Sequence, residues 1–180
     1  MSRPPRARES VLDAFEAALI DGGARGATMD AVAAAAGVSK GGLLYHYASK
    51  EALESALIER MRRLVDLDVE EMLRSPDGIV AVFVRTSVQS DTPLDRAIVA
   101  TSRLAQTGHD AASVALRDAR RVWEDALRPH TRDESALQLV LLVSDGLYFN
   151  SALATQGVPG PIPQGDDLDA LIALVERAAR

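Results

Sequence analysis

The side chains best suited to a chemical role are concentrated between Thr28 and Lys50. Thr28 and Ser39 each place a hydroxyl group before a short run of helix-forming residues. Such a group caps a helix N-terminus, where free backbone N–H groups also attract a phosphate. Tyr45 and His46 add hydrogen-bond donors, and Lys50 adds a positive charge suited to a phosphate. Together these groups indicate contacts with DNA.

Two adjacent glycines, Gly41 and Gly42, fall in the same stretch, inside a segment that its neighbours predict to be helical. Glycine is a poor helix former, so the pair would be a liability in a purely structural helix. Without side chains, however, both positions allow DNA to come close to the backbone. We therefore include both glycines in the candidate DNA-binding surface, together with Lys40.

These residues must be positioned by two short helices and the turn between them. The pattern predicts helices over residues 29–36 and 40–47, joined by Gly37-Val38-Ser39. In the turn the glycine permits the required conformation and the valine is an apolar plug, while the alanines at 33–36 allow the helices to approach closely. This is the helix-turn-helix pattern, whose second helix enters the major groove of DNA.

The rest of the chain also repeats its apolar residues every three or four positions, which predicts an all-helical protein. A first helix ends at Gly22-Gly23, and a long helix covers about residues 49–74. The proline-rich segment 157–165 predicts a loop, after which a last helix begins with a cap at Asp166 or Asp167. The helices expected in between cover about residues 77–89, 92–107, 110–128 and 132–155.

Composition excludes several classes of function. The 180 residues contain no cysteine, which excludes disulfides, iron–sulfur clusters, thiolate zinc sites and a cysteine nucleophile. No hydrolase, phosphate-loop or metalloprotease motif is present, so we expect neither an enzyme nor a cofactor. His46 has no second histidine within helical reach, which argues against a metal site. Every apolar run, such as 139–143, is far shorter than the roughly 20 residues that cross a bilayer. We therefore expect a cytoplasmic protein with no membrane partner.

Charge is distributed unevenly along the chain. The net charge is −6 overall, but residues 1–50 carry +1 and the remaining residues carry −7. An acidic body with a mildly basic N-terminal part indicates a molecule with two functions. We divide it into a helix-turn-helix DNA-binding domain over residues 1–52 and a second helical domain over residues 53–180.

Residues 28–33, followed by 37–53, closely resemble the N-terminal DNA-binding domain of the TetR family of bacterial transcriptional regulators. The resemblance covers about the first 55 residues, and the remainder is similar only in length and in its all-helical pattern. The family commonly has threonine at the position of Gly42 and tyrosine at the position of Leu44. This chain therefore lacks two hydroxyl groups that relatives carry there.

The resemblance implies a homodimer that binds a palindromic operator in double-stranded DNA, usually as a repressor, and releases it when a small-molecule effector enters the C-terminal domain. Arg3, Arg6 or Arg8 are expected to add phosphate contacts, and Tyr47 matches a position where the family keeps a buried aromatic residue. The DNA contacts implied by position are Thr28, Ser39, Lys40, Gly41, Gly42, Tyr45, His46 and Lys50.

A dimer is also expected on physical grounds, because one short recognition helix reads only a few base pairs and two-fold pairing supplies the missing affinity. The penultimate and last helices offer apolar faces for a four-helix interface like that of the family. The expected interface residues are Leu137, Val140, Leu141, Ser144, Leu147, Tyr148, Leu168, Leu171, Ile172 and Val175.

An effector site is expected among aromatic and polar residues of the C-terminal domain, and an apolar or amphipathic effector fits this aromatic-poor domain. Each candidate is also explained by simple packing or exposure, since a lone tryptophan on an apolar helix face usually belongs to a core. The candidates are Phe83, Arg103, His109, Trp123, Tyr148, Phe149 and Asn150.

Two alternatives stay open for the N-terminal part. Taken singly, Ser39, Lys40 and Lys50 are explained as a helix cap and two solvated charges. In the second alternative the chain is a helical ligand-binding or interaction protein that keeps the helix-turn-helix as a structural relic. DNA affinity that falls steeply with salt distinguishes a regulator from both alternatives.

Overall fold

Glycines set the ends of the first helices. The structure is a computed structural model that describes residues 4–154 and 160–180. Helix α1 (Pro4–Gly26) has a non-helical backbone at Gly23, with φ +63° and ψ −174°, so the glycine pair interrupts the helix as predicted, and only a short turn follows. Helices α2 (Met29–Ala35) and α3 (Lys40–His46) are joined through Gly37, whose φ of +67° lies in the left-handed region that favours glycine.

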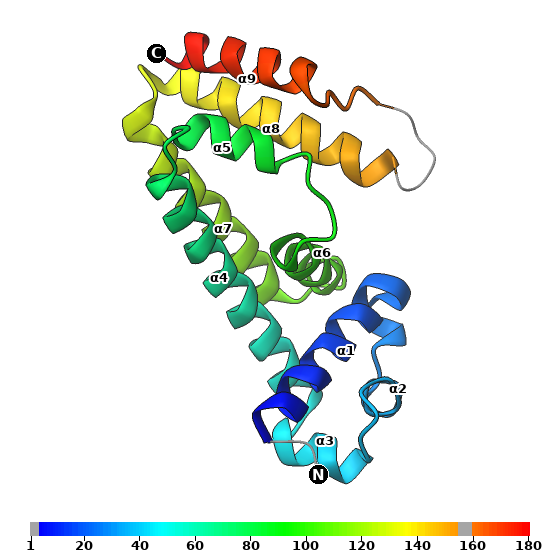
Figure 1. The fold of residues 1–180 in the computed structure, drawn as a ribbon. Helices are drawn as coiled ribbons and strands as arrows, with labels where there is room; N and C mark the ends of the chain where they lie inside the picture. The colour runs from blue at the N-terminus through cyan, green and yellow to red at the C-terminus, as the bar shows by residue number, and fades with distance from the viewer. Residues whose placement is uncertain (1–3, 155–159) are drawn as a thin grey trace. The chain divides into compact units, whose positions relative to one another are not determined.

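The helices after the first three are α4 (Lys50–Arg74), α5 (Ile79–Thr86), α6 (Pro93–Ala105), α7 (Asp110–Leu127), the short 3-10 helix η1 (Arg128–His130), α8 (Glu134–Ala154) and α9 (Asp166–Ala179) (Figure 1). All regular secondary structure in the described ranges is helical, which confirms the predicted fold class. Helix α5 is shorter than predicted because Gly78, with φ +88°, precedes its first residue.

The predicted cap of the last helix is wrong. Gly165, with φ +53°, is the residue before α9, and no side chain caps the helix there. Asp166 and Asp167 lie in the first turn instead, where their negative charges interact favourably with the positive end of the helix dipole. Residues 160–164 are non-helical as predicted, and the predicted loop at residues 157–159 lies outside the described residues.

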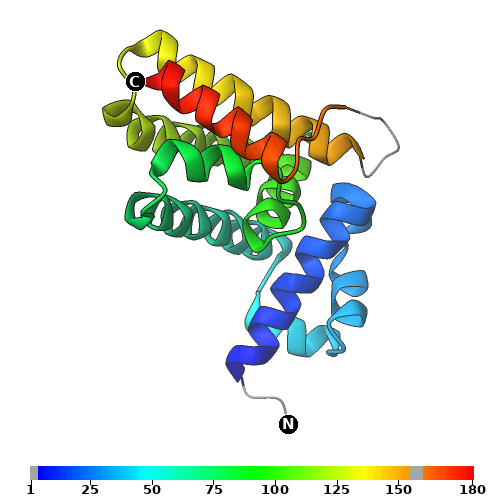
Figure 2. The ribbon, with the colours of Figure 1, turned by 45° about the horizontal axis from the view of Figure 1, so that its top comes forward.

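The helices form two compact units. The head unit comprises the described residues up to Leu64 together with Pro93–Ala119, and within it α1 packs against α2, α3 and α6. The body unit comprises Val65–Thr92 and Arg120–Arg180 without the masked stretch, and within it α5, α8 and α9 pack on one another (Figure 2). By its contacts α6 packs in the head unit with α1, and the domain division at residue 52 stays a prediction.

A partly buried cluster of charges joins helices of the head unit beside its apolar core. Arg60 on α4 contacts carboxylate oxygens of Glu9, Asp13 and Glu16, which lie on successive turns of α1, at 2.8, 2.8 and 3.3 Å. Burial alone would lower the pKa of Arg60, but the hydrogen bonds that its guanidinium donates to Glu9 and Asp13 outweigh it and raise the pKa. Glu16 also accepts a hydrogen bond from Arg96 Nε on α6 at 3.0 Å. The buried Glu16 carboxylate thus joins three helices.

Candidate nucleic-acid interface

Hydroxyl groups cap both helices of the helix-turn-helix. Thr28 Oγ1 accepts a hydrogen bond from the backbone N–H of Ala31 at 3.2 Å, and Ser39 Oγ accepts one from Gly42 at 3.1 Å. Both cap residues have extended backbones and exposed side chains. The caps are therefore confirmed as caps, and they stand at the surface where a phosphate would approach.

Packing between α2 and α3 uses fewer small residues than predicted. Of the alanines at 33–36, Ala33 is buried with its neighbour Val32, while Ala34 and Ala35 face solvent. Val38 is half-buried in the turn. Of the four alanines, only Ala33 is therefore buried where the two helices approach each other.

The outer face of α3 carries an exposed surface. Tyr45 is 83% exposed, Leu44 is 42% exposed and Gly41 is also exposed, and their spacing places all three on one side of the helix. The half-buried His46 ring meets the Tyr45 ring edge-on, with centroids 5.2 Å apart. Leu43 is fully buried on the opposite side and anchors the helix.

The two glycines of α3 differ in their surroundings. A Cβ atom at Gly41 would have a single neighbour, Ser39 Oγ at 4.0 Å, so the protein's own packing does not require glycine there. A Cβ atom at Gly42 would lie 3.3 Å from the same hydroxyl oxygen and 3.7 Å from Val38 Cβ, which crowds the cap. The structure therefore explains why residue 42 is a glycine, whereas it gives no such reason at residue 41.

Both lysines expected at a phosphate have partners within the chain. Lys40 Nζ pairs with Asp30 Oδ1 on α2 at 3.0 Å, and both side chains are exposed, so this pair is weak. Lys50 Nζ donates a hydrogen bond to the backbone carbonyl of Ala24 at 2.9 Å. An ammonium group has three donors, so Lys50 can keep this bond and still offer a proton to a phosphate.

Tyr47 is a core residue, as predicted. It is 3% exposed, and burial raises the pKa of its phenol. Its hydroxyl donates to the carbonyl of Arg8 at 3.4 Å, and the Arg8 guanidinium lies 5.2 Å from the centre of its ring. Arg6 is exposed, and Arg3 lies outside the described residues.

The residues predicted to contact an effector are not gathered in one place. Arg103 and His109 belong to the head unit, and the other candidates belong to the body unit. Arg103 is exposed. His109 Nδ1 accepts a hydrogen bond from the Ala112 N–H at the start of α7, and its Nε2 lies 3.4 Å from Glu54. His109 thus acts as a helix cap.

Phe83 and Trp123 do lie together in the body unit, with ring centroids 6.4 Å apart. Phe83 is buried in the apolar core, and Trp123 Nε1 donates to Asp68 Oδ2 at 2.9 Å. Burial raises the pKa of Asp68, although the hydrogen bond from Trp123 acts in the opposite direction. Nothing in the sequence singles out Asp68, because it is one of many acidic residues on α4.

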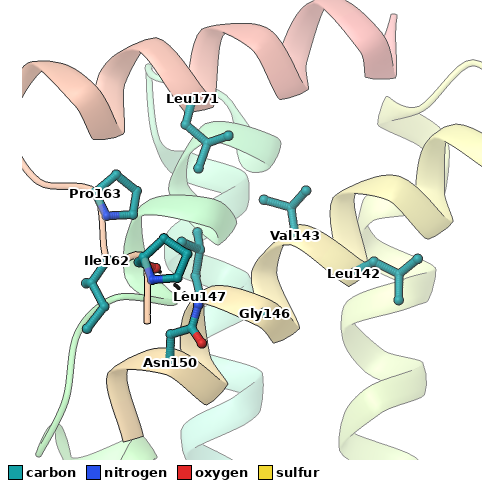
Figure 3. Close-up of a pocket in the computed structure, with 9 residues that line it drawn as sticks. Leu142, Val143, Gly146, Leu147, Asn150, Ile162, Pro163 and Leu171 are labelled. Atoms are coloured by element: carbon teal, nitrogen blue, oxygen red, sulfur yellow. Dashed lines mark hydrogen bonds between the residues drawn. The ribbon is translucent and has the colours of Figure 1, made fainter. Parts of the chain in front are cut away.

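An apolar groove of about 560 Å³, open to solvent, lies between α8, the segment before α9, and α9 itself (Figure 3). Of the predicted effector residues, Asn150 lines it, and its Nδ2 donates to the carbonyl of Pro161 at 3.1 Å. Phe149 is exposed and Tyr148 is half-buried. The groove is lined by Leu142, Val143, Gly146, Leu147, Asn150, Pro161, Ile162, Pro163 and Leu171.

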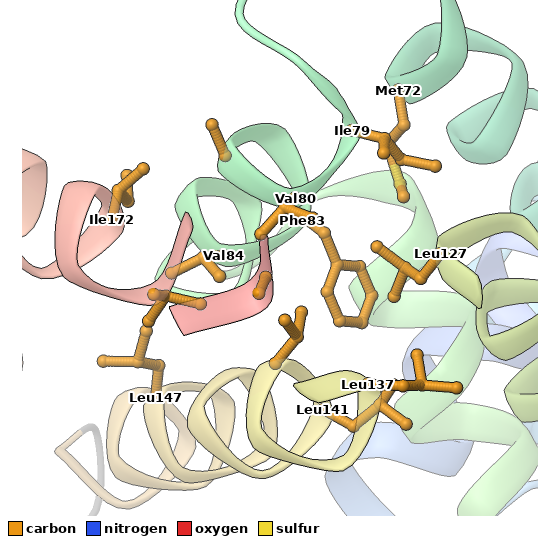
Figure 4. Packing of buried hydrophobic residues seen from close by; sticks show 14 of the residues in the cluster. Met72, Ile79, Val80, Phe83, Val84, Leu127, Leu137, Leu141, Leu147 and Ile172 are labelled. Atoms are coloured by element: carbon orange, nitrogen blue, oxygen red, sulfur yellow. The ribbon is translucent and has the colours of Figure 1, made fainter. Parts of the chain in front are cut away.

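Most of the predicted dimer residues point into the core of their own chain, which corrects that prediction (Figure 4). Ser144 is buried too, and its hydroxyl group is hydrogen-bonded to that of Ser87. Helical spacing identifies an apolar face, but it does not tell whether the face packs within one chain or between two. Tyr148 and Leu171 are the two that stay partly exposed. The buried apolar residues are Leu137, Val140, Leu141, Leu147, Leu168, Ile172 and Val175.

A different apolar stripe lies on the outside of α8 and α9. Leu139, Leu142 and Phe149 on α8 are 39%, 65% and 61% exposed, and Leu174 on α9 is 55% exposed. Their spacing along α8 places them on one side of the helix, with Gly146 among them. We call Leu139, Leu142, Gly146, Phe149 and Leu174 the outer stripe. Exposed apolar side chains grouped in this way are typical of interaction sites.

The described residues contain neither a candidate membrane span nor a candidate metal cluster. None of the helices there is long and apolar enough to cross a membrane. In the same ranges, histidine, aspartate and glutamate side chains do not gather in groups of three or more that would hold a metal ion.

Known structures share this fold. A putative TetR-family transcriptional regulator from Rhodococcus sp. is 17% identical, with a TM-score of 0.67 and coverage of 97% of this chain and 98% of that one. Salmonella enterica GusR is 17% identical, with a TM-score of 0.69 and coverage of 99% and 98%. The fatty acid degradation regulator FadR from Bacillus halodurans is 18% identical, with a TM-score of 0.59 and coverage of 94% and 95%.

Sequence models of two domains match the chain. The model for bacterial regulatory proteins of the tetR family matches residues 11–57, and the model for a tetracyclin repressor-like C-terminal domain matches residues 77–176. No curated protein matches the sequence. The two models together cover most of the chain, and the proteins of this family are regulators of transcription and not enzymes. The chain therefore belongs to the TetR family of bacterial transcriptional regulators.

Proposed function

We propose that this regulator acts in the cytoplasm as a homodimeric repressor, which binds a palindromic operator and releases it when a small-molecule effector binds the body unit. The observation that carries DNA binding is the outer face of α3, where Gly41 and the exposed Tyr45 stand beside the Ser39 cap. The inward Leu43 fixes this face by anchoring the helix. A rigid helix that offers a bare backbone and an exposed phenol suits the major groove.

The outer stripe supports the proposed dimer. Leu142 and Phe149 are more than half exposed, although apolar side chains of this size gain about 1.5–3 kcal/mol each when fully buried. Pairing of α8 and α9 with the same helices of a second copy would bury them by two-fold symmetry. Gly146 lies within the stripe and has no neighbour within 4 Å of a Cβ position, so it leaves room for a partner helix.

Helix α4 supports a mechanical link between effector and operator. It begins at Lys50, directly after the helix-turn-helix, and continues into the body unit, where Asp68 meets Trp123. An effector that displaces this half of α4 would shift the spacing of the two recognition helices. Effector and operator would then weaken each other's binding reciprocally, commonly by about 1–3 kcal/mol.

The test is selection from random duplex DNA by the purified full-length protein, followed by affinity measurements at several salt concentrations. We expect a palindrome with half-sites about one DNA turn apart, and an affinity that falls steeply with salt. Tyr45→Ala should lose the enrichment. Arg74→Ala, which removes an exposed cation from α4 outside the helix-turn-helix, is the matched control and should retain it.

Light scattering coupled to gel filtration tests the dimer. Leu142→Glu should give a folded monomer with weak operator binding, whereas Leu67→Glu, at an exposed leucine on α4, should stay dimeric. A wild-type protein that is folded but enriches no sequence and shows no salt-dependent binding would contradict the proposed function.

A further inference from the structure

We propose that Leu44 reads thymine bases in each half-site through their C5-methyl groups. The inference rests on the proposed DNA-binding function and specifies how that surface recognises sequence. Leu44 is 42% exposed on α3, whereas the adjacent Leu43 is fully buried. The buried leucine already anchors the helix, so the exposed one has no comparable role within the chain.

Few groups on α3 can form hydrogen bonds with base edges. Gly41 and Gly42 have no side chains, and Lys40, whose exposed pair with Asp30 is weak, supplies the side-chain donor of the first turn. Tyr45 and His46 carry the remaining hydrogen-bonding groups, and both lie at the C-terminal end of the seven-residue helix. Recognition helices read bases mainly with their N-terminal and central residues. Among the exposed residues of α3, Leu44 is the one nearest the centre of the helix.

The neighbours of Leu44 favour close contact with the groove floor. Gly41 lies one turn earlier on the same face and lets the backbone approach DNA, because nothing there projects beyond the main chain. Tyr45, which is 83% exposed, extends beside Leu44 and is long enough to reach the sugar–phosphate backbone while the shorter leucine faces the bases.

Thymine is the base that fits an apolar side chain. Its C5-methyl group is the one apolar group that the major-groove edges of the four bases present. A leucine packed against a cytosine amino group or a guanine carbonyl would instead remove water from a polar group without replacing its hydrogen bond. Leu44 is thus expected both to favour thymine and to penalise other bases at the same position.

The experiment replaces thymine by deoxyuridine, one symmetric pair at a time, in the operator obtained by selection. Uracil keeps every hydrogen-bonding group of thymine and lacks only the methyl group. At one position we expect the substitution to weaken operator binding by the wild type. Loss of one buried methyl group lowers the affinity about fourfold in each half-site, and therefore about 15-fold for the palindrome. Leu44→Ala should bind the thymine and uracil operators equally well. Tyr45→Phe, which leaves Leu44 in place, should retain the uracil sensitivity.

The outcomes separate the inference from the function on which it rests. Selection of a palindrome without any uracil-sensitive position would overturn the role of Leu44 and leave the regulator intact. The same holds if the sensitivity persists in Leu44→Ala, because another residue then reads the methyl group. Failure to select any sequence, with a folded dimer, would overturn both. Circular dichroism of Leu44→Ala checks that the exposed substitution leaves the fold unchanged.

Discussion

Both units bury an apolar core, but they differ in what accompanies it. In the head unit, Arg60 meets three carboxylates of α1, and the buried Glu16 also binds Arg96 of α6. The body unit packs fifteen buried apolar residues in one cluster and leaves further leucines and a phenylalanine on its surface. Ion pairs have strict geometry, whereas apolar packing is non-directional and tolerates more than one partner.

This difference matches the two proposed contacts, DNA at the head unit and a second copy at the body unit. The head unit anchors α3 through the buried Leu43 and exposes Leu44 and Tyr45 on the outer face of this helix. These are the side chains that we propose to contact DNA. The body unit exposes the same residue types that it buries, such as Leu142 outside and Leu141 inside. Four tests sharpen or break this contrast.

A large loss of stability is expected for Glu16→Ala. Removing one partner of a buried ion pair leaves uncompensated charge and typically costs about 3–5 kcal/mol. We expect the lower end of this range, because Arg60 keeps its contacts with Glu9 and Asp13. Equilibrium urea unfolding at a fixed protein concentration measures the loss. The control is Asp30→Ala, which breaks an exposed pair and should cost less than about 1 kcal/mol. Equal costs for the two variants would remove the contrast between the units.

Adjacent leucines test the body unit. Leu141→Ala creates a cavity in the core and should lower the free energy of unfolding by about 2–5 kcal/mol. Leu142→Ala removes an exposed side chain and should leave monomer stability nearly unchanged while weakening self-association. The measurements are chemical denaturation and sedimentation equilibrium. If Leu142→Ala leaves self-association intact, the outer stripe is not the dimer interface.

Gly41→Ala should change stability and DNA affinity in opposite directions. A Cβ atom fits there without a clash, so the better helix former should stabilise the head unit by up to about 1 kcal/mol. The same methyl group would hold α3 away from the groove and weaken operator binding. Thermal unfolding and fluorescence anisotropy with labelled operator measure the two effects. Unchanged operator affinity would mean that DNA does not approach the backbone at this glycine.

Asp68→Asn is expected to have the smallest effect, and one that depends on pH. Burial raises the folded-state pKa of Asp68 above its ordinary value of 3.8, so the folded protein binds this proton more tightly than the unfolded chain. Its contribution to stability is therefore greatest at low pH and is lost as pH rises through the folded-state pKa. Asparagine keeps an oxygen for the Trp123 N–H and carries no charge. The melting temperature of the variant relative to wild type should rise between pH 4 and neutrality, and a constant difference would contradict the burial of charge.

Local signals in the sequence predict the head well, because caps and turns depend on residues close to one another. Thr28, Ser39 and Gly37 define the ends of α2 and α3 in sequence and structure alike. The Arg60 cluster was not predictable in this way, since its partners come from helices far apart in the chain and look like solvated charges.

In the body unit, the apolar repeat predicts helices but not their partners. Leu137 and Leu141 were assigned to a second copy, yet they fill the core of their own chain. The reason is that α8 is apolar on more than one side, so periodicity alone leaves the inward side undefined. The residues predicted to contact an effector lie in different places for a related reason. The presence of an aromatic side chain in the sequence does not show whether it packs in a core or contacts a ligand.

The position of Trp123, whose indole is hydrogen-bonded to Asp68, has a spectroscopic consequence. Trp123 is the only tryptophan in the sequence, and it lies in the body unit. Selectively excited tryptophan emission therefore follows the body unit alone, while far-ultraviolet dichroism follows all the helices. If the two signals change at different urea concentrations, the two units unfold as separate cooperative steps. This single indole thus allows the body unit to be followed in the intact protein without an added label.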